Sequence, residues 1–215
     1  MEGTIFTMKK IVITGPIGAG KSLFAQEASS YFTKKGYAVY TLELDEIGKQ
    51  ILEDKNVQIL LADAFGQEVL VGASAKSVDK EVLAQRAFAS DEAAKRLNEV
   101  THNAIAHKVE KELQCIQEQG DTAVVLIETP FPIEYLRTTP FAEQVSDACV
   151  VVIKAPYEKR MERCQHRISN AAQRDERQRS YGAFDGDIII QNDTSADEFL
   201  YAIQETLAHE MEECL

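Results

Sequence analysis

The feature that most constrains this chain is a glycine-rich turn that joins an apolar run to the beginning of a predicted helix. The apolar run is Ile11–Ile13, and the turn reads GPIGAGKS. Glycines let successive backbone N–H groups approach an anion, and the helix N-terminus adds the positive end of its dipole. In such a phosphate loop the lysine reaches the β- and γ-phosphates and the serine hydroxyl binds Mg²⁺. The residues predicted to bind a nucleoside triphosphate are Gly15, Pro16, Ile17, Gly18, Ala19, Gly20, Lys21 and Ser22, with Ser22 also a metal ligand.

The composition argues against several classes of partner. The net charge is −12 at pH 7 over 215 residues, whereas binding to nucleic acid or to an anionic membrane needs a basic surface. The four cysteines contain no CxxC pair, and no apolar run is long enough to span a bilayer. We therefore expect a cytoplasmic protein with reduced thiols and a small-molecule substrate, of open oligomeric state.

Five short apolar runs predict the strands of an α/β fold. Helical periodicity separates them, which predicts a five-stranded parallel sheet with helices on both faces. Ligands of such sheets bind beyond the carboxyl ends of the strands. The predicted strands are Ile11–Ile13, Tyr37–Leu42, Ala123–Ile127, Ala148–Ile153 and Ile188–Ile190.

The domain organisation follows from where this alternation is interrupted. One domain is predicted over residues 1–215, with a core made of 8–45, 121–165 and 186–215. Residues 46–120 show helical periodicity without a strand pattern, which predicts a helical insertion that binds the substrate. Residues 166–185 are polar and rich in arginine with little to bury, which is typical of a closing lid.

Three acids stand at predicted strand ends. Asp45 closes the second strand, which we expect next to the phosphate loop; it either takes the proton from an acceptor hydroxyl or caps the helix that follows. Glu43 binds Mg²⁺ or the acceptor, or is a solvated charge. Glu128 ends the third strand, where an acid often holds the water shell of the metal.

Basic residues gather in the second half of an otherwise acidic chain. Tyr157–Arg167 reads as one basic helix, with Arg163 and Arg167 a turn apart on the same face. Both arginines can then point at the triphosphate, and a solvated basic helix is the alternative. The lid adds Arg174, Arg177 and Arg179.

Taken together, these features resemble the dephospho-coenzyme A kinase family over nearly the whole chain. The phosphate loop, the acid pair at the end of strand two and the paired arginines match motifs of the family. Several positions depart from it: Glu43 and Glu128 each stand where the family has Asp, Lys80 stands where arginine is usual, Asn103 replaces a proline after His102, and Pro132 interrupts a Leu-Leu pair. The matching segments are GPIGAGKS, Glu43–Asp45, Lys80 with His102, Glu128–Glu134, Arg163 with Arg167, Arg174 with Gln178, and Gly186–Asn192.

The resemblance implies a P-loop kinase that uses ATP and Mg²⁺ to phosphorylate the ribose 3′-hydroxyl of dephospho-CoA, the last step of coenzyme A biosynthesis. It implies that Asp45 is the base and that Lys21, with Arg163 or Arg167, stabilises the transferred charge. Arg174 and Asn192 are implied to bind the nucleotide. The acceptor site is implied to contain Glu43, Lys80, His102, Pro130 and Glu134. Two alternatives stay open: a kinase of the same fold with another hydroxyl acceptor, and a non-catalytic nucleotide or coenzyme A binder.

Overall fold

A computed structural model describes residues 8–72, 77–120, 122–165, 167–168 and 170–211. The chain forms two compact units. The first contains the chain up to Glu43 and from Leu113 onward, and the second is Leu44–Glu112. The long helix α5 (Asp91–Glu118) contributes residues to both units.

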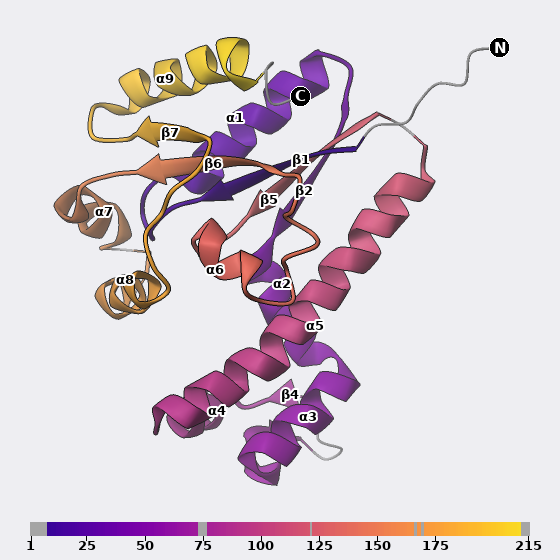
Figure 1. The fold of residues 1–215 in the computed structure, drawn as a ribbon. Helices are drawn as coiled ribbons and strands as arrows, with labels where there is room; N and C mark the ends of the chain where they lie inside the picture. The colour runs from indigo at the N-terminus through magenta and orange to yellow at the C-terminus, as the bar shows by residue number, and fades with distance from the viewer. Residues whose placement is uncertain (1–7, 73–76, 121, 166, 169, 212–215) are drawn as a thin grey trace. The chain divides into compact units, whose positions relative to one another are not determined.

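The first unit is built on a five-stranded parallel sheet, as the sequence predicts (Figure 1). Its spatial order is β2-β5-β1-β6-β7. Each predicted strand is confirmed within about three residues at its ends; the central strands β1, β5 and β6 are buried on both faces and so leave continuous apolar runs in the sequence. The strands are β1 (Met8–Thr14), β2 (Ala38–Glu43), β5 (Ala123–Glu128), β6 (Cys149–Lys154) and β7 (Ile188–Gln191).

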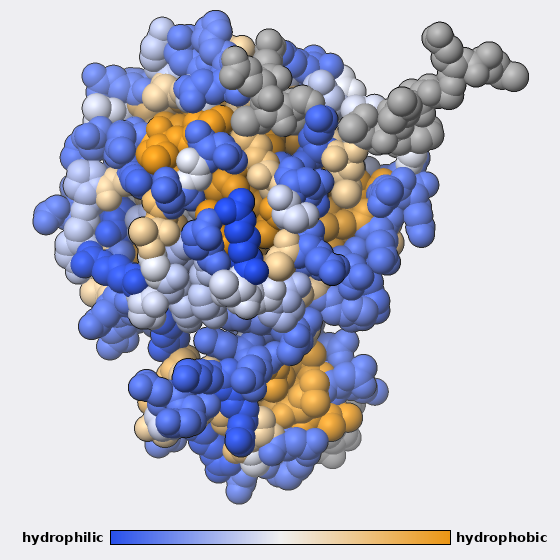
Figure 2. All heavy atoms as spheres, viewed as in Figure 1, coloured by the Kyte–Doolittle hydropathy of each residue, from blue (hydrophilic) through white to orange (hydrophobic). Residues whose placement is uncertain are grey.

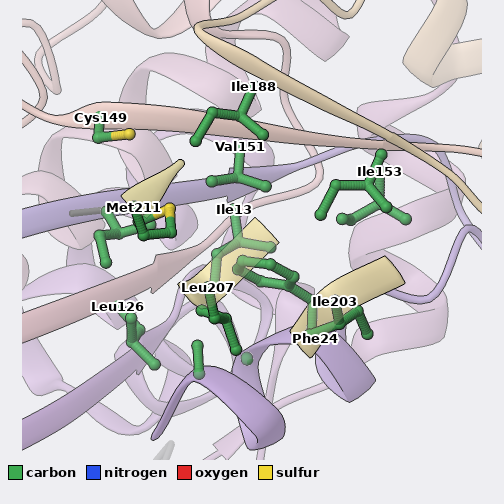
Figure 3. Packing of buried hydrophobic residues seen from close by; sticks show 14 of the residues in the cluster. Ile13, Phe24, Leu126, Cys149, Val151, Ile153, Ile188, Ile203, Leu207 and Met211 are labelled. Carbon is green, nitrogen blue, oxygen red and sulfur yellow. The ribbon is translucent and has the colours of Figure 1, made fainter. Parts of the chain in front are cut away.

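One face of this sheet packs against α1 (Lys21–Lys34) and α9 (Ala196–His209). Figure 3 shows Ile13 and Val151 of the sheet beside Phe24 of α1 and Ile203 of α9. Strand residues that alternate with these, such as Val12, are also fully buried, so the opposite face of the sheet is covered too. The sheet is therefore a rigid base for the loops at its carboxyl edge.

The strand order corrects one expectation about the site. β5 lies between β2 and β1, so the phosphate-loop strand has β5 and β6 as its neighbours. In register, Glu128 of β5 pairs with Ile13 of β1 on one side and with Glu43 of β2 on the other. The neighbour of β1 on this side is thus β5, which ends in Glu128. The prediction that the second strand, β2, lies next to the phosphate-loop strand is wrong. Sequence order does not fix the order in space, because a crossover can leave room for a later strand.

The second unit is mainly helical. Gly66, with φ +91°, ends α3, and Ser90 caps α5 by accepting the backbone N–H of Ala93 at 3.2 Å. β3 and β4 pair as a short antiparallel hairpin, so the expectation of an insertion without strands is wrong. Two-residue strands are too short to leave a period-two pattern. The elements are α2 (Leu44–Gln50), η1 (Ile51–Glu53), α3 (Lys55–Phe65), η2 (Gln67–Val69), β3 (Leu70–Val71), β4 (Ser77–Val78), α4 (Lys80–Ala87) and the first part of α5.

Apolar side chains reach the surface of this second unit. Ile59 and Leu60 of α3 are each at least half exposed, and Figure 2 shows apolar residues on the surface over this part of the chain. No helix among the described residues combines the length and apolar character needed to cross a membrane.

Three further helices follow β5 and β6 in the chain: α6 (Ile133–Arg137) after β5, and α7 (Tyr157–Cys164) and α8 (Ala171–Ser180) after β6. The predicted basic helix ends at Cys164 rather than at Arg167, because the chain turns so that the N–H groups of Arg167 and Ile168 both bond to the Cys164 carbonyl. The predicted lid contains α8, which buries three residues. The expectation that this segment has little to bury is therefore wrong. The buried residues of α8 are Ala171, Asp175 and Gln178.

No disulfide joins the cysteines that the structure describes, which are Cys115, Cys149 and Cys164. Cys149 and Cys164 are buried and Cys115 is exposed. Cys214, for which a reduced thiol is also expected, lies outside the described residues.

Candidate functional site: a phosphate loop at the carboxyl edge of the sheet

The phosphate loop follows β1 and depends on its glycines. Gly15 has φ +145°, and a Cβ atom there would lie 2.2 Å from the Ile153 carbonyl oxygen. Gly20 has φ +110°, and a Cβ atom there would lie 2.6 Å from the Asn192 side-chain nitrogen. Any larger residue would therefore be strained in its backbone and would clash with β6 or with the residue after β7. The close packing explains why the loop has glycine at these two positions.

The N-terminus of α1 is suited to an anion. Among the described residues, its N-cap Gly20 provides no side-chain cap, and the first turn contains no acid. The positive end of the helix dipole is therefore not neutralised by the helix itself. Lys21 begins the helix, and its Nζ donates to the carbonyls of Gly15 at 2.9 Å and of Pro16 at 3.4 Å. Its ammonium group thus lies over the loop that would hold the phosphates.

Ser22 and Glu128 lie together beside this helix end. The Ser22 hydroxyl donates to Glu128 Oε1 at 2.9 Å, although the two residues are 106 positions apart in the chain. Glu43 of β2 lies opposite Glu128 of β5 in the register of the two neighbouring strands. A hydroxyl and carboxylate oxygens are donors that Mg²⁺ accepts, together with waters and substrate phosphates. The residues therefore fit the metal that the phosphate-loop pattern predicts.

Arg163 is held against the loop from α7. One of its terminal nitrogens donates to the Gly18 carbonyl at 3.4 Å, and the other donates to the backbone and side-chain oxygens of Asn192 at 3.1 and 3.0 Å. The Asn192 amide in turn donates to the Ala19 carbonyl at 2.7 Å. Asn192, predicted to bind the nucleotide, is buried and joins the end of β7 to the phosphate loop.

A pocket of about 910 Å³ opens over the loop. It brings together Lys21, Ser22, Glu128, Arg163 and Asn192, with Arg167 on its wall as well. Arg167 reaches the pocket from the turn after α7 and not from the same helical face as Arg163. Arg174 is exposed on α8 and is not among the lining residues. The full lining is Gly18, Gly20, Lys21, Ser22, Leu23, Glu128, Lys159, Glu162, Arg163, Cys164, Arg167, Ile168, Asn192, Thr194, Ala196 and Phe199.

The segment after β5 is fixed to the end of β1. The Thr14 hydroxyl donates to the Phe131 carbonyl at 2.6 Å, and the Thr129 N–H donates to the Ile13 carbonyl at 3.0 Å. The Phe131 ring contacts Tyr135 and Tyr181, and burial, with a smaller contribution from Tyr181, raises the pKa of Tyr135 to about 12. The Tyr135 phenol is therefore neutral at pH 7, and it belongs to an aromatic cluster with Phe131 and Tyr181.

Pro130 and Glu134, both predicted to bind the acceptor, belong to this same segment. Pro130 lies between Thr129 and Phe131 and is half-buried. Glu134 is exposed on α6 and forms an ion pair with Arg137 at 2.6 Å. Their roles toward an acceptor stay predictions.

Three predicted residues lie in the second unit. Asp45 is in the first turn of α2, which begins at Leu44, so Asp45 is not the N-cap of that helix. Lys80 is the first residue of α4 and is exposed. His102 is buried on α5, and this burial holds the pKa of its imidazole below the usual value. The roles of these residues also stay predictions.

Comparison with known protein families supports the interpretation of the pocket. The family model described as dephospho-CoA kinase matches residues 10–198. The chain belongs to the dephospho-CoA kinase family. A dephospho-CoA kinase of Corynebacterium diphtheriae is 28% identical over 217 residues, with 95% of this chain and 96% of the relative covered.

Other members of the dephospho-CoA kinase family are similar over part of their length. The relative from Dehalococcoides mccartyi is 32% identical over 127 residues, covering 59% of this chain and 60% of its own. The alignment with the relative from Corynebacterium glutamicum also spans 60% of that protein. Among solved structures, the dephospho-CoA kinase from Campylobacter jejuni matches with a TM-score of 0.61 at 20% identity, over 97% of this chain and all of the other. That likeness confirms the fold.

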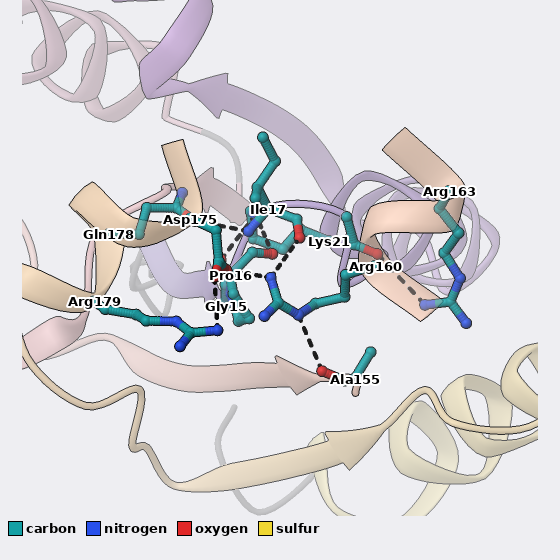
Figure 4. Close-up of polar contacts among 11 residues, drawn as sticks. Gly15, Pro16, Ile17, Lys21, Ala155, Arg160, Arg163, Asp175, Gln178 and Arg179 are labelled. Carbon is teal, nitrogen blue, oxygen red and sulfur yellow. Dashed lines mark hydrogen bonds and ion pairs between the residues drawn. The ribbon is translucent and has the colours of Figure 1, made fainter. Parts of the chain in front are cut away.

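The contacts that attach α8 to the phosphate loop of this chain could not be recognised from the predicted elements. In the sequence Arg160 is one charge of the predicted basic helix Tyr157–Arg167, and Asp175 falls within the predicted lid. Both are almost completely buried, and they form an ion pair beneath the loop (Figure 4). The sequence signal that could have indicated this is the spacing of Arg160 and Cys164, since a small apolar residue four positions later lies on the same face of α7 and is typical of a buried face.

Proposed function

We propose that this chain transfers the γ-phosphoryl group of ATP to the ribose 3′-hydroxyl of dephospho-CoA, in the cytoplasm and with small molecules as its only substrates. The observation that carries the proposal is the pocket over the phosphate loop, where Lys21, Arg163 and the Ser22–Glu128 pair converge. Membership of the dephospho-CoA kinase family supports the acceptor. The fold places this pocket where ligands of parallel sheets bind.

The proposed reaction forms a bond between the acceptor oxygen and the γ-phosphorus while the bond to the β-phosphate oxygen breaks. Backbone N–H groups of the loop and the Lys21 ammonium would bind the phosphates. Arg163 and Arg167, both on the pocket wall, would offset the negative charge that spreads over the transferred group. ADP then leaves, and the acceptor carries a new phosphomonoester.

Ser22 and Glu128 would hold the magnesium ion of the substrate. Their oxygens are 2.9 Å apart in the structure, and Glu43 follows in the next strand. When bound, Mg²⁺ supplies positive charge to the β- and γ-phosphates. Ser22 and Glu128 would orient the nucleotide through it.

Asp45 is the proposed base that accepts the proton of the acceptor hydroxyl. A single residue, Leu44, separates it from Glu43 at the carboxyl end of β2. A carboxylate in this position is the group that such a transfer needs to orient its nucleophile. Glu43, Lys80, His102, Pro130 and Glu134 are proposed to bind the acceptor, and Arg174 and Asn192 the nucleotide.

The proposal is tested by ADP release from purified protein with ATP and Mg²⁺. We expect ADP to form only when dephospho-CoA is added, and the product to carry a new 3′-phosphate by mass spectrometry. Nucleosides and other small alcohols serve as the comparison panel. ADP release that is unaffected by dephospho-CoA but stimulated by another alcohol would reassign the acceptor, and ATP binding without turnover of any acceptor would indicate a nucleotide sensor.

Glu128→Gln is expected to raise the Mg²⁺ concentration for half-maximal rate by about tenfold, because it removes charge beside Ser22 but keeps the size of the side chain. The measurement is a magnesium titration of ADP release. Glu162→Gln is the matched control, since Glu162 lies on the wall of the same pocket and is exposed. An equal shift in both variants would mean that only the overall charge of the pocket matters.

A further inference from the structure

The backbone of Ile17 in the phosphate loop is held on both sides by side chains from the helices that follow β6. Its carbonyl accepts from Arg160 Nη1 of α7 at 3.0 Å. Its N–H donates to the side-chain oxygen of Gln178 of α8 at 2.7 Å. Figure 4 shows these side chains converging on Ile17. Two elements about 140 and 160 residues further along the chain thus fix one peptide of the loop.

Arg160 is itself fixed in a buried network. It is 4% exposed, its Nε donates to the Ala155 carbonyl at 3.0 Å, and its Nη1 pairs with Asp175 of α8. Asp175 is 1% exposed, and its second carboxylate oxygen pairs at 2.8 Å with Arg179, which is largely exposed. The Nε and Nη1 groups of Arg160 therefore bond to two carbonyls and one carboxylate, and these bonds fix the direction of its guanidinium group.

A buried ion pair is a weak means of stabilising a fold. Desolvation of two charges offsets most of their attraction, and apolar residues of similar volume often stabilise a protein as well or better. What such a pair does provide is a fixed direction for its hydrogen-bonding groups. Here those groups point at the loop that would bind the phosphates, so geometry rather than stability accounts for the pair.

We propose that Arg160, Asp175 and Gln178 are positioning residues: they hold the Ile17 peptide in the orientation needed for tight ATP binding, and they make that orientation depend on the docking of α8 against the loop. The proposal rests on the proposed function in one respect, that the loop binds ATP. It assigns α8 a role in ATP binding, because Gln178 and Asp175, the partner of Arg160, both belong to this helix and would leave the loop together if the helix moved away.

The test compares five variants by thermal unfolding and by ATP binding in isothermal titration calorimetry, without acceptor. Arg160→Met or Asp175→Leu alone leaves a buried charge, so each should lower Tm by about 10 °C. The double variant Arg160→Met/Asp175→Leu removes both charges, so its Tm should return to within about 4 °C of the wild type. Its Kd for ATP should nevertheless stay about tenfold weaker, because the Ile17 carbonyl has lost its charged donor.

Gln178→Met keeps the buried ion pair and removes only the acceptor of the Ile17 N–H, so it should weaken ATP binding by about fivefold and lower Tm by less than either single charge variant does. Arg179→Met is the matched control, because Arg179 pairs with the same Asp175 while its own side chain is largely exposed; its Kd for ATP should stay within about twofold of the wild type. KM for the acceptor should not change in any variant that folds.

Wild-type affinity for ATP in both the double variant and Gln178→Met would overturn the inference and leave the proposed function intact. An equal loss of affinity in Arg179→Met would also overturn it, since charge alone would then explain the effect. A wild-type protein that binds no ATP would overturn both the inference and the proposed function.

Discussion

Lys21→Ala is expected to reduce kcat for ADP release by about 10³, because it removes the ammonium group that would offset charge on the transferred phosphoryl group. In the structure this group lies over the phosphate loop, 2.9 Å from the Gly15 carbonyl oxygen. The measurement is steady-state ADP release at saturating ATP and acceptor. Far-ultraviolet circular dichroism and Tm report whether the fold is kept.

Lys34→Ala is the control for this variant. Lys34 is an exposed lysine in the last turn of the same helix, so Lys34→Ala removes one positive charge and the same side-chain atoms as Lys21→Ala does. We expect the activity of Lys34→Ala to stay within about twofold of the wild type, with a small loss of stability from the helix dipole. A Lys21→Ala variant that keeps more than a tenth of the wild-type kcat would rule out Lys21 as the main charge stabiliser.

Asp45→Asn is expected to lower kcat by about 10³, within the range for loss of a general base. The amide has the size of the carboxylate but cannot accept the proton of the acceptor hydroxyl. Because Asp45 is proposed to act on the acceptor, the Kd for ATP should be nearly unchanged. Rapid-quench measurement of a single turnover separates this loss in the chemical step from a change in product release.

Asp63→Asn is the matched control for Asp45→Asn, since Asp63 is an exposed aspartate on α3 of the same unit. We expect its activity to equal that of the wild type. If Asp45→Asn keeps nearly full activity, Asp45 is not the base, and the phosphate loop alone remains as evidence for nucleotide binding. If it loses ATP binding together with activity, its role is on the nucleotide side.

The roles proposed for Lys21 and Asp45 differ from the role proposed for Arg160 and Asp175 in the kinetic constant that each affects. Lys21 and Asp45 would act in the chemical step, so their variants lower kcat. The buried pair would act through the shape of the loop, so its double variant weakens ATP binding and leaves KM for the acceptor alone. Kinetics with each substrate varied separately can therefore assign each residue to its step.

Much of the fold could be predicted because the signals that specify it are local. Continuous apolar runs such as Ala123–Ile127 indicate strands buried on both faces, and the capping box at the beginning of α9 is formed by Ser195 and Glu198, only three residues apart. The phosphate loop is also local, since strand, glycines and helix follow one another within fifteen residues of sequence. The family, the parallel sheet and the kinase fold were therefore predicted correctly from residues near one another in the chain.

Other features could not be predicted because they depend on residues far apart in the chain. The 2.9 Å contact of Ser22 with Glu128 exists only because β5 inserts between β2 and β1. The basic helix ends at Cys164 because the chain after it turns to pack Ile168 and Ala171 against Ile17. Polarity made the segment after this turn look like an unanchored lid, whereas its buried residues contact the loop.

The sequence by itself determined which chemical groups this protein has for handling a triphosphate: a glycine loop, a lysine, a hydroxyl and several arginines. Only the tertiary structure decided which of them meet, since a long-range contact depends on the order of strands and on where helices end. Arg160 shows the difference most clearly. In the sequence it is one of several similar charges, and burial beside Asp175 turns it into a fixed support of the phosphate loop.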